Sequence, residues 1–397
     1  RVAEAVAIKD GRFVAVGSTD DIRRLAGAGT RQIDLGGRTV VPGFIDGHPH
    51  MDGVGMQLIL PSFDSAKSID DILGVIGKEA AKRRPGEWIV CNPLANEPAA
   101  FNYPGALKEG RWPDRKDLDR VSPDNPVFIR PPSLVSPGFA FANSAALRLA
   151  GITRDTAVPD AVEIMKDEGG EPTGVIKDLN FPKRIEAALF RAIPPTSQKQ
   201  LVRGLRAGVK AFNEAGITGI YEGHGIPAGP QRAYIDLWSE GALSVRTYFV
   251  ISYPIPVYRD TAAGDAIIRE TAKYAGGRGL GDDILKLGGL GFSFDSAAAI
   301  GACLMRKPYM GAQGRLWNGV QHTPDENFKS IMLKGARANL RMQVQCSGGA
   351  AIDKVLAIFE DVNREIPIAG KRWVIEHCQF PSAGNMATCK KLGIVPT

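Results

Sequence analysis

The sequence predicts an α/β protein built on a parallel sheet, and three observations support this prediction. From about residue 198 onward, helical patterns alternate with short β-branched runs, which is the order of βα units. Residues 40–46 are apolar on both faces, as expected of a strand buried in a parallel sheet. Of the 397 residues, 44% are hydrophobic and 23% are charged, a globular composition that excludes a disordered chain or a coiled coil.

The first forty residues carry short apolar runs that predict a hairpin. Residues 5–8 and 13–17 flank the step Asp10-Gly11, and Asp-Gly between two apolar runs is a strong hairpin signal. Another short strand is expected at residues 32–35. These strands precede the first strand of the parallel sheet.

Residues 63–205 interrupt the alternation with a mixture of helical stretches, short strands and turns. A helical pattern covers residues 69–83, whereas residues 88–90 and 127–129 have the composition of short strands. Glycines within residues 168–174 predict a hairpin loop. This stretch therefore differs from the region that follows it.

The alternating region, together with residues 40–46, predicts one parallel sheet. A closed parallel barrel has eight strands, so one further βα unit would complete it. The open sheet would expose two edges, and we expect that another chain covers them or that the full protein is longer. The seven expected strands are residues 40–46, 218–221, 244–251, 284–287, 341–346, 372–375 and 393–396.

Charge and cysteine content exclude several kinds of protein. The net charge of +6 is scattered, and Lys82-Arg83-Arg84 is too short a run to predict a nucleic-acid partner. Five cysteines without a Cys-x-x-Cys pair argue against a disulfide framework and favour a reducing compartment, the cytoplasm. No run approaches the ~20 apolar residues that cross a bilayer, and no signal-peptide pattern is present.

The sequence has five histidines, and two of them form the motif His48-Pro49-His50 directly after the first expected sheet strand. Residues two apart on a strand point the same way, so both imidazoles can reach one metal ion. In a parallel βα barrel the carboxyl ends of the strands form the active-site face. The motif predicts a metal site, with two loop histidines that bind nothing as the alternative.

Several stretches of the chain resemble the amidohydrolase superfamily. Residues 41–50 are similar to its first-strand metal motif, and residues 10–17 resemble strands of its N-terminal β-sandwich. Other stretches resemble the YtcJ-like group, amidohydrolase family 3: residues 117–127, 143–147, 170–175 and 373–377. The resemblance covers nearly the whole chain and is more specific for the fold than for the substrate.

The resemblance implies a (β/α)8 TIM-type barrel with a small β-sandwich side domain and an insertion after strand one. The last barrel strand and half of the sandwich would be absent from this chain. The implied parts are the N-terminal part of the sandwich (1–38), the first barrel strand with the metal loop (39–62), the insertion domain (63–205) and the remaining barrel (206–397).

The resemblance also implies a divalent metal, usually zinc, as one or two ions. Such an ion lowers the pKa of bound water and polarises the carbonyl of the substrate. Together with the charge and cysteine content, the resemblance predicts a cytoplasmic homodimer that acts on a small molecule and binds neither nucleic acid nor membrane.

By position, the resemblance implies four metal ligands. His48 and His50 match the first-strand pair. Lys286, expected at the end of strand 284–287, matches a lysine that is carboxylated in many relatives and bridges two metals. A lysine that extends to the barrel rim is the alternative. His377 matches the sixth-strand ligand and is also assigned a catalytic role, with a buried core histidine as the alternative.

Three polar positions of the family are neutral or apolar in this chain. Gln345 stands where the fifth strand normally ends in a histidine, and the adjacent Cys346 should point to the other face. Leu290 and Gly138 stand in place of an aspartate and a histidine. The metal-binding aspartate that would act as general base lies beyond Thr397.

Two functions are compatible with these residues. The first is a metal-dependent hydrolase that cleaves a C–N bond (amide, carbamate or N-acyl) with metal-activated water. In it, His224 after strand 218–221 is a catalytic residue that orients substrate or carries protons. A loop histidine bonded to backbone is the alternative for His224. The second function is a divergent non-catalytic or mononuclear relative, acting as a binding or assembly subunit, which the three altered positions favour.

Overall fold

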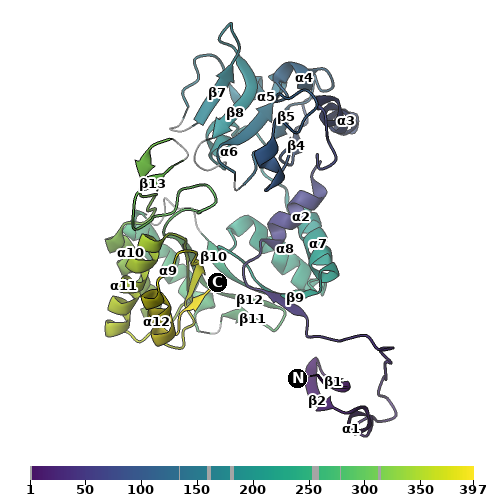
Figure 1. Cartoon of the computed structure of the whole chain (residues 1–397), viewed down its shortest axis with the longest axis vertical. Coiled ribbons are helices and arrows are strands. Elements are labelled where there is room, and N and C mark those ends of the chain that lie inside the picture. The colour runs from purple at the N-terminus through teal and green to yellow at the C-terminus, as the bar shows by residue number, and fades with distance from the viewer. Residues whose placement is uncertain are drawn as a thin grey trace. The chain divides into compact units, whose positions relative to one another are not determined.

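The computed structural model describes residues 2–133, 135–158, 162–178, 183–252, 259–277, 279–311 and 314–397. They form two compact units, one ending at Pro42 and one covering Gly43–Thr397, and each is described by itself (Figure 1).

The first unit contains the predicted hairpin. Strand β1 (Ala5–Lys9) pairs antiparallel with β2 (Arg12–Gly17), and helix α1 (Thr19–Arg23) follows. The prediction of a strand at residues 32–35 is wrong, because these residues are irregular and no third described strand pairs with the hairpin. A β-sandwich therefore stays a prediction.

The second unit is built on the predicted parallel sheet, which curls as part of a barrel (Figure 1). Its seven strands pair in chain order, each parallel to its neighbour, which confirms the order of the predicted series; closure by an eighth strand stays a prediction. The first strand differs from its prediction, because it covers only Phe44–Asp46 of residues 40–46, and Phe44 and Ile45 are exposed instead of buried. A short β11 (Leu280–Gly281) pairs antiparallel with β12. The strands are β3 (Phe44–Asp46), β9 (Ile217–Tyr221), β10 (Arg246–Ser252), β12 (Leu285–Ser293), β15 (Met342–Cys346), β16 (Val374–His377) and β17 (Val395–Pro396).

Strand β12 is longer than the sequence predicts, and this changes the position of Lys286. The strand expected to end at Leu287 continues to Ser293, so Lys286 is its second residue. The chain passes through Gly288-Gly289 with a φ of 121° at Gly289, and the pairing with β10 shifts register there. Glycine adopts this φ without a steric penalty, so the strand bends instead of ending.

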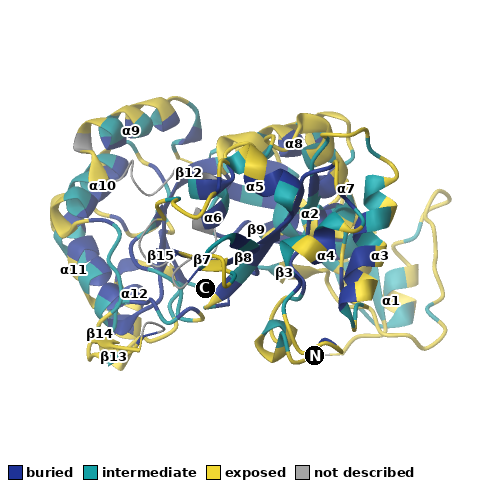
Figure 2. Cartoon of the chain, turned by 90° about the horizontal axis from the view of Figure 1, so that it is seen from above, coloured by how far each residue is buried: buried dark blue, intermediate teal, exposed yellow. Residues whose placement is uncertain are grey.

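Helices connect the strands and pack against the sheet. Their buried sides form two apolar cores, one around Tyr234 and Phe249 and one around Phe359 and Trp373. Figure 2 shows helices with dark blue inner sides and yellow outer sides. None of the helices in the described ranges is long and apolar enough to cross a membrane. The helices are α2 (Met51–Ile59), α7 (Gln198–Glu214), α8 (Ala228–Ser239), α9 (Thr261–Ala275), α10 (Asp325–Arg337), α11 (Gly349–Glu365) and α12 (Ala383–Leu392).

A separate five-stranded sheet lies within the stretch predicted as an insertion domain, in the order β4-β5-β6-β8-β7. It has two apolar cores of its own. The predicted boundaries at residues 38, 62 and 205 stay predictions. The elements are α3 (Ile69–Ala80), β4 (Ile89–Cys91), the 3-10 helix η1 (Ala99–Asn102), α4 (Arg115–Asp119), β5 (Val127–Ile129), β6 (Gly138–Ala142), α5 (Ser144–Ala150), β7 (Val162–Lys166), β8 (Pro172–Asp178) and α6 (Lys183–Leu189). A short hairpin follows β12, formed by β13 (Tyr309–Met310) and β14 (Leu316–Trp317).

Asn143 is a fully buried polar residue that links several segments around this second sheet. Its amide nitrogen donates to the carbonyls of Ser122 and Asn125 at 2.7 and 2.9 Å. Its carbonyl oxygen accepts from the backbone N–H groups of Val127 and Ala146, both at 2.9 Å. The side chain therefore satisfies four backbone groups that are closed off from water.

Replacing Asn143 with alanine is expected to lower the free energy of unfolding by about 3 kcal/mol, because buried backbone groups lose their partners. Chemical denaturation followed by circular dichroism measures the change. Asn213→Ala is the control, since its amide is exposed and bonds to the Ser244 hydroxyl. Equal stability of the two variants would contradict the prediction.

Candidate metal centre

Four of the five histidines lie together at the carboxyl edge of the parallel sheet. The ring centroid of His48 lies 5.5, 4.8 and 4.7 Å from those of His50, His224 and His377. Potential ligand atoms of His48, His50 and His224 all lie within 4.8 Å of one another. Nε2 of His224 is 3.0 Å from Nε2 of His377. Three different strands, β3, β9 and β16, thus bring imidazoles to one point.

Two of these histidines have a left-handed backbone. The φ angles of His224 and His377 are 57° and 68°, a region that residues with a side chain rarely occupy. Such a conformation costs about 1–3 kcal/mol and persists only where surrounding contacts hold it. Both carboxylate oxygens of Glu376 accept from the backbone N–H of His224, at 3.0 and 3.1 Å. The fold thus holds His224 in a conformation that the local sequence does not favour.

Glu376 is a fully buried carboxylate beside the imidazoles. In addition to the His224 N–H, it accepts a hydrogen bond of 2.6 Å from Nε2 of Gln343. Its Oε1 lies 3.4 Å from Nδ1 of His48. Burial raises the pKa of Glu376 to about 8, against the lowering effect of the hydrogen bonds from His224 and Gln343.

Glu222, which directly follows β9, is a second buried carboxylate. It accepts from the backbone N–H of Met51 at 3.1 Å and from the Tyr234 hydroxyl at 2.9 Å. Its Oε1 lies 4.0 Å from Nδ1 of His50. Burial, with Asp52 nearby, raises the pKa of Glu222 well above its usual value.

Burial favours the neutral, metal-binding form of two of these imidazoles, those of His48 and His377. Burial, together with the nearby His377 and His50, lowers the pKa of His48 to about 4. Burial, with His50, also lowers the pKa of His377. Neutral imidazole is a ligand, whereas protonated imidazole is not. Among the described residues, neither buried ring nitrogen of His48 has a hydrogen-bond partner.

These observations fit a divalent cation. It would satisfy a ring nitrogen that otherwise loses hydration without a partner, and it would compensate the buried carboxylates. Three imidazoles with an open position are a common ligand set of catalytic zinc.

Gly223 leaves room for the imidazoles. A Cβ at this position would lie 2.9 Å from Nε2 of His48 and 3.0 Å from Cε1 of His50. The backbone N–H of Gly223 donates to the Pro49 carbonyl at 2.8 Å, which connects the loop after β9 to the His-Pro-His motif. A larger residue would separate the two sets of ligands.

A second chain of contacts orients His377. Its Nδ1 lies 3.0 Å from the Ser347 hydroxyl, while its Nε2 faces His224. The backbone N–H groups of Ser347, Gly348 and Leu304 donate to the carboxylate of Asp295 at 2.8, 2.8 and 3.0 Å. Asp295 is fully buried, and burial raises its pKa to about 6 against the lowering effect of these donors.

The structure does not bring Lys286 to the imidazoles. The expectation that Lys286 ends its strand is wrong, because β12 begins at Leu285 and Lys286 pairs in register with Tyr248. The β12 residue beside the His224 loop is Gly291, where a Cβ would lie 2.9 Å from the His224 carbonyl oxygen. A carboxylated Lys286 therefore has no place in the centre described here.

The structure places the three positions that depart from the family pattern, and the neighbouring Cys346, in different surroundings. Gln345 is on β15 in register with Glu376, and Cys346 is buried in the apolar core, on the other face as predicted. Leu290 is buried in the same core, and Gly138 begins β6 of the second sheet.

Sequence reasoning missed several residues of the site. Glu376 and Glu222 could have been found, because each is a carboxylate next to or near a histidine in an otherwise apolar stretch, in Glu376-His377 and in Glu222-Gly223-His224. For Asp295, Ser347 and the space requirement at Gly223, the sequence offered no comparable signal.

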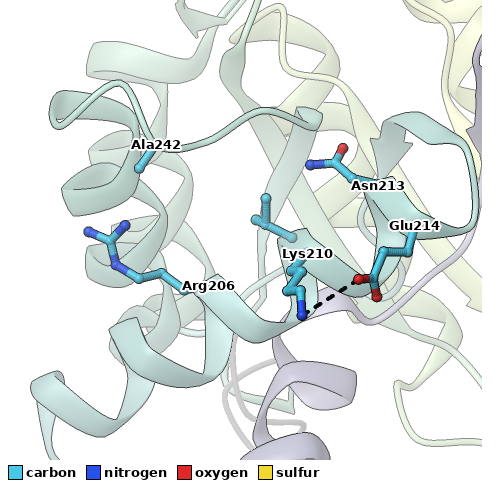
Figure 3. Close-up of a pocket in the computed structure, with 6 residues that line it drawn as sticks. Arg206, Lys210, Asn213, Glu214 and Ala242 are labelled. Atoms are coloured by element: carbon cyan, nitrogen blue, oxygen red, sulfur yellow. Dashed lines mark ion pairs between the residues drawn. The ribbon is translucent and has the colours of Figure 1, made fainter.

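Two hollows outside the histidine cluster offer no comparable chemistry. A surface depression of about 430 Å³ lies along α7, but Lys210 there pairs with Glu214 (Figure 3). Arg206, which also lines it, pairs with Glu240. An aromatic pocket in the second sheet, lined by Trp112 and Phe139 among others, has a volume of about 20 Å³, which is room for one water molecule. The candidate site is therefore the histidine cluster.

A parallel βα sheet with imidazoles at the carboxyl ends of separate strands is the architecture of metal-dependent βα-barrel enzymes. Residues 31–397 match the model of the amidohydrolase family. The chain belongs to that family, and the resemblance seen in its sequence is confirmed.

Two curated relatives resemble this chain in sequence, and a solved structure resembles it in fold. The chain is 28% identical to the putative amidohydrolase YtcJ of Bacillus subtilis over 365 residues, 90% of this chain and 62% of that protein. It is 30% identical to the N-substituted formamide deformylase of Arthrobacter pascens over 221 residues, 55% of this chain and 38% of that protein. A crystal structure of an uncharacterized metal-dependent hydrolase from Pyrococcus furiosus superposes with a TM-score of 0.72 at 20% identity, over 98% of this chain and 72% of that one. The chain spans less than two thirds of the length of these two curated relatives.

Proposed function

We propose that the protein is a metal-dependent hydrolase that cleaves a C–N bond in a small amide, carbamate or N-acyl compound. The observation that carries the proposal is the set of ligand atoms of His48, His50 and His224 within 4.8 Å of one another. Membership of the amidohydrolase family and the similarity to an N-substituted formamide deformylase support the choice of bond. The cytoplasmic location and the homodimer are part of the same proposal.

Each imidazole has its own role in this proposal. His48, His50 and His224 hold one divalent ion, zinc, which when bound lowers the pKa of water and polarises a carbonyl. His377 carries a proton at Nε2, because Ser347 contacts its Nδ1 and the Nε2 faces the ligand His224. Lys286 has no role in binding the ion.

The full-length, natively purified protein tests the proposal. Elemental analysis is expected to find about one zinc ion per chain, and the protein should hydrolyse members of a panel of N-substituted formamides, N-acyl amines and carbamates. His48→Ala is expected to lose the ion and the activity, whereas Lys286→Met keeps both.

Two results would count against the proposal. Hydrolysis that survives complete removal of metal would contradict the ligand set. A full-length protein without stoichiometric metal and without activity would favour the second candidate, a non-catalytic binding or assembly subunit. The neutral Gln345 at the end of β15 is the observation that favours that candidate.

A further inference from the structure

We propose that Gln345 and Ser293 form a substrate subsite beside the imidazoles, which binds an uncharged hydrogen-bonding group such as a carboxamide. The inference rests on the proposed hydrolase function and deepens it by naming a class of substrate. Neither residue belongs to the proposed ligand set, and neither is the proposed proton carrier.

Gln345 lies on the inner face of β15, away from the helices. Successive side chains of a strand point to opposite faces of the sheet. Val344 and Cys346, on either side of Gln345, are buried in the apolar core around Phe359 and Trp373. The side chain of Gln345 therefore points to the face that does not carry this core.

The residues two before and two after Gln345 both contact the histidine cluster or its carboxylate. Gln343 donates to Glu376 at 2.6 Å, and the Ser347 hydroxyl lies 3.0 Å from Nδ1 of His377. Gln345 shares their face and lies between them along the chain. Its amide therefore lies beside the cluster at the carboxyl edge of the sheet.

The amide of Gln345 is enclosed but not hydrogen-bonded. Only 7% of the residue is exposed, and no hydrogen bond reaches its side chain from the part of the chain that the structure describes. The fully enclosed, unpartnered polar atoms of the described residues belong to other side chains, so this amide keeps an accessible surface. An amide withdrawn from water without a partner loses hydrogen-bonding free energy, which a ligand group in contact with it restores.

Ser293 of β12 extends this neutral polar surface. It is in register with Gln345, which in turn is in register with Glu376. Phe292 and Phe294 are buried in the same apolar core as the neighbours of Gln345, so Ser293 faces the same side as Gln345. Its hydroxyl has no hydrogen-bond partner among the described residues. An amide and a hydroxyl thus occupy neighbouring positions on two strands.

The chemistry of this row favours an uncharged polar group. The Gln345 nitrogen donates and its oxygen accepts, which matches both halves of a carboxamide. A carboxylate would be buried beside Glu376 in a row without lysine or arginine, and burying a charge without a partner is costly. An aliphatic group would leave the amide unpaired. The neutral residue near the end of β15 thus has a use in an enzyme, as a source of specificity.

Three amines of the same shape test the subsite on the full-length, zinc-loaded protein. They are glycinamide, glycine and isobutylamine, which differ in carrying a carboxamide, a carboxylate or an isopropyl group, and each is used as its N-formyl and N-acetyl derivative. The parent is expected to hydrolyse the glycinamide derivatives with a kcat/KM roughly tenfold above that for the isobutylamine derivatives, the effect of one net hydrogen bond. The glycine derivatives are expected to be the poorest substrates.

Gln345→Met keeps the length of the side chain and removes the amide. It is expected to lower the ratio of kcat/KM for glycinamide over isobutylamine to about one, with unchanged zinc content. Ser293→Ala should lower the same ratio and serves as the second variant if Gln345→Met does not fold. Gln343→Met is the matched control, because it removes an amide on the same face that is already bonded to Glu376. It should change the rates for all derivatives alike and keep the ratio of the parent.

A parent that hydrolyses these compounds without preferring glycinamide would overturn the inference and leave the proposed function intact. Equal ratios for Gln345→Met and Gln343→Met would do the same. Where the parent hydrolyses none of the derivatives, ligand-observed NMR decides the subsite: binding of the glycinamide derivatives that Gln345→Met abolishes supports it, and equal or absent binding rejects it. Failure of the proposed function is recognised separately, by the absence of hydrolysis across the whole substrate panel.

Discussion

Gly223→Ala is expected to weaken metal binding by the full-length protein strongly, although glycine contributes no ligand. The added Cβ would lie 2.9 Å from Nε2 of the proposed ligand His48 and 3.0 Å from a ring carbon of His50. The loop cannot move away freely, because the Gly223 N–H bonds to Pro49 and the next N–H bonds to Glu376. We expect an affinity at least ~100-fold weaker, about 2.7 kcal/mol, measured by competition for Zn²⁺.

Gly47→Ala is the matched control for this substitution. Gly47 precedes His48, and a Cβ there would meet no atom within 4 Å. Both glycines have φ angles outside the left-handed region, so alanine adds steric bulk in both cases without backbone strain. Equal zinc affinities of the two variants would show that space at Gly223 does not define the centre.

His377→Asn is expected to keep the ion and to lower kcat by roughly 10²- to 10⁴-fold, which is the usual contribution of a general acid–base group. Asparagine cannot carry a proton between water and substrate, while the proposed ligands His48, His50 and His224 remain. Elemental analysis and steady-state kinetics on the same preparation separate the two effects.

His322→Asn is the control, because His322 lies outside the histidine cluster and its backbone N–H bonds to Phe294. It should retain the kcat of the parent. Loss of the ion from His377→Asn in parallel with activity would instead assign His377 to the ligands, the other role implied by the family resemblance.

The parallel sheet was predictable from the sequence because its signal is local. Six of the seven strands are short apolar runs preceded by a helical pattern, and all seven occur in the expected chain order. The prediction failed at β12, where Gly288-Gly289 resembles a strand end. Whether a glycine pair ends a strand or bends it depends on pairing with β10 and β15, which the sequence does not contain.

The site was only partly predictable, because some of its contacts join residues that are far apart in the sequence. The His-Pro-His motif is visible within three residues, so the sequence alone indicates a metal site. The contacts of the carboxylates join distant positions: Glu222 bonds to Met51, 171 residues away, and Glu376 bonds to His224, 152 residues away. The prediction for Lys286 failed because the strand was expected to end at Leu287 but continues to Ser293. Lys286 therefore lies near the amino end of β12 and not at the carboxyl edge of the sheet.

The carboxylate of Asp295 has a consequence for changing the specificity of this protein. It anchors two loops, through Leu304 on one side and through Ser347 and Gly348 on the other. A chimera that imports one of these loops from a relative would pair it with a mismatched neighbour, and the hydroxyl beside His377 would move. Loop grafting at this edge therefore has to transfer both segments, together with the aspartate, as one block.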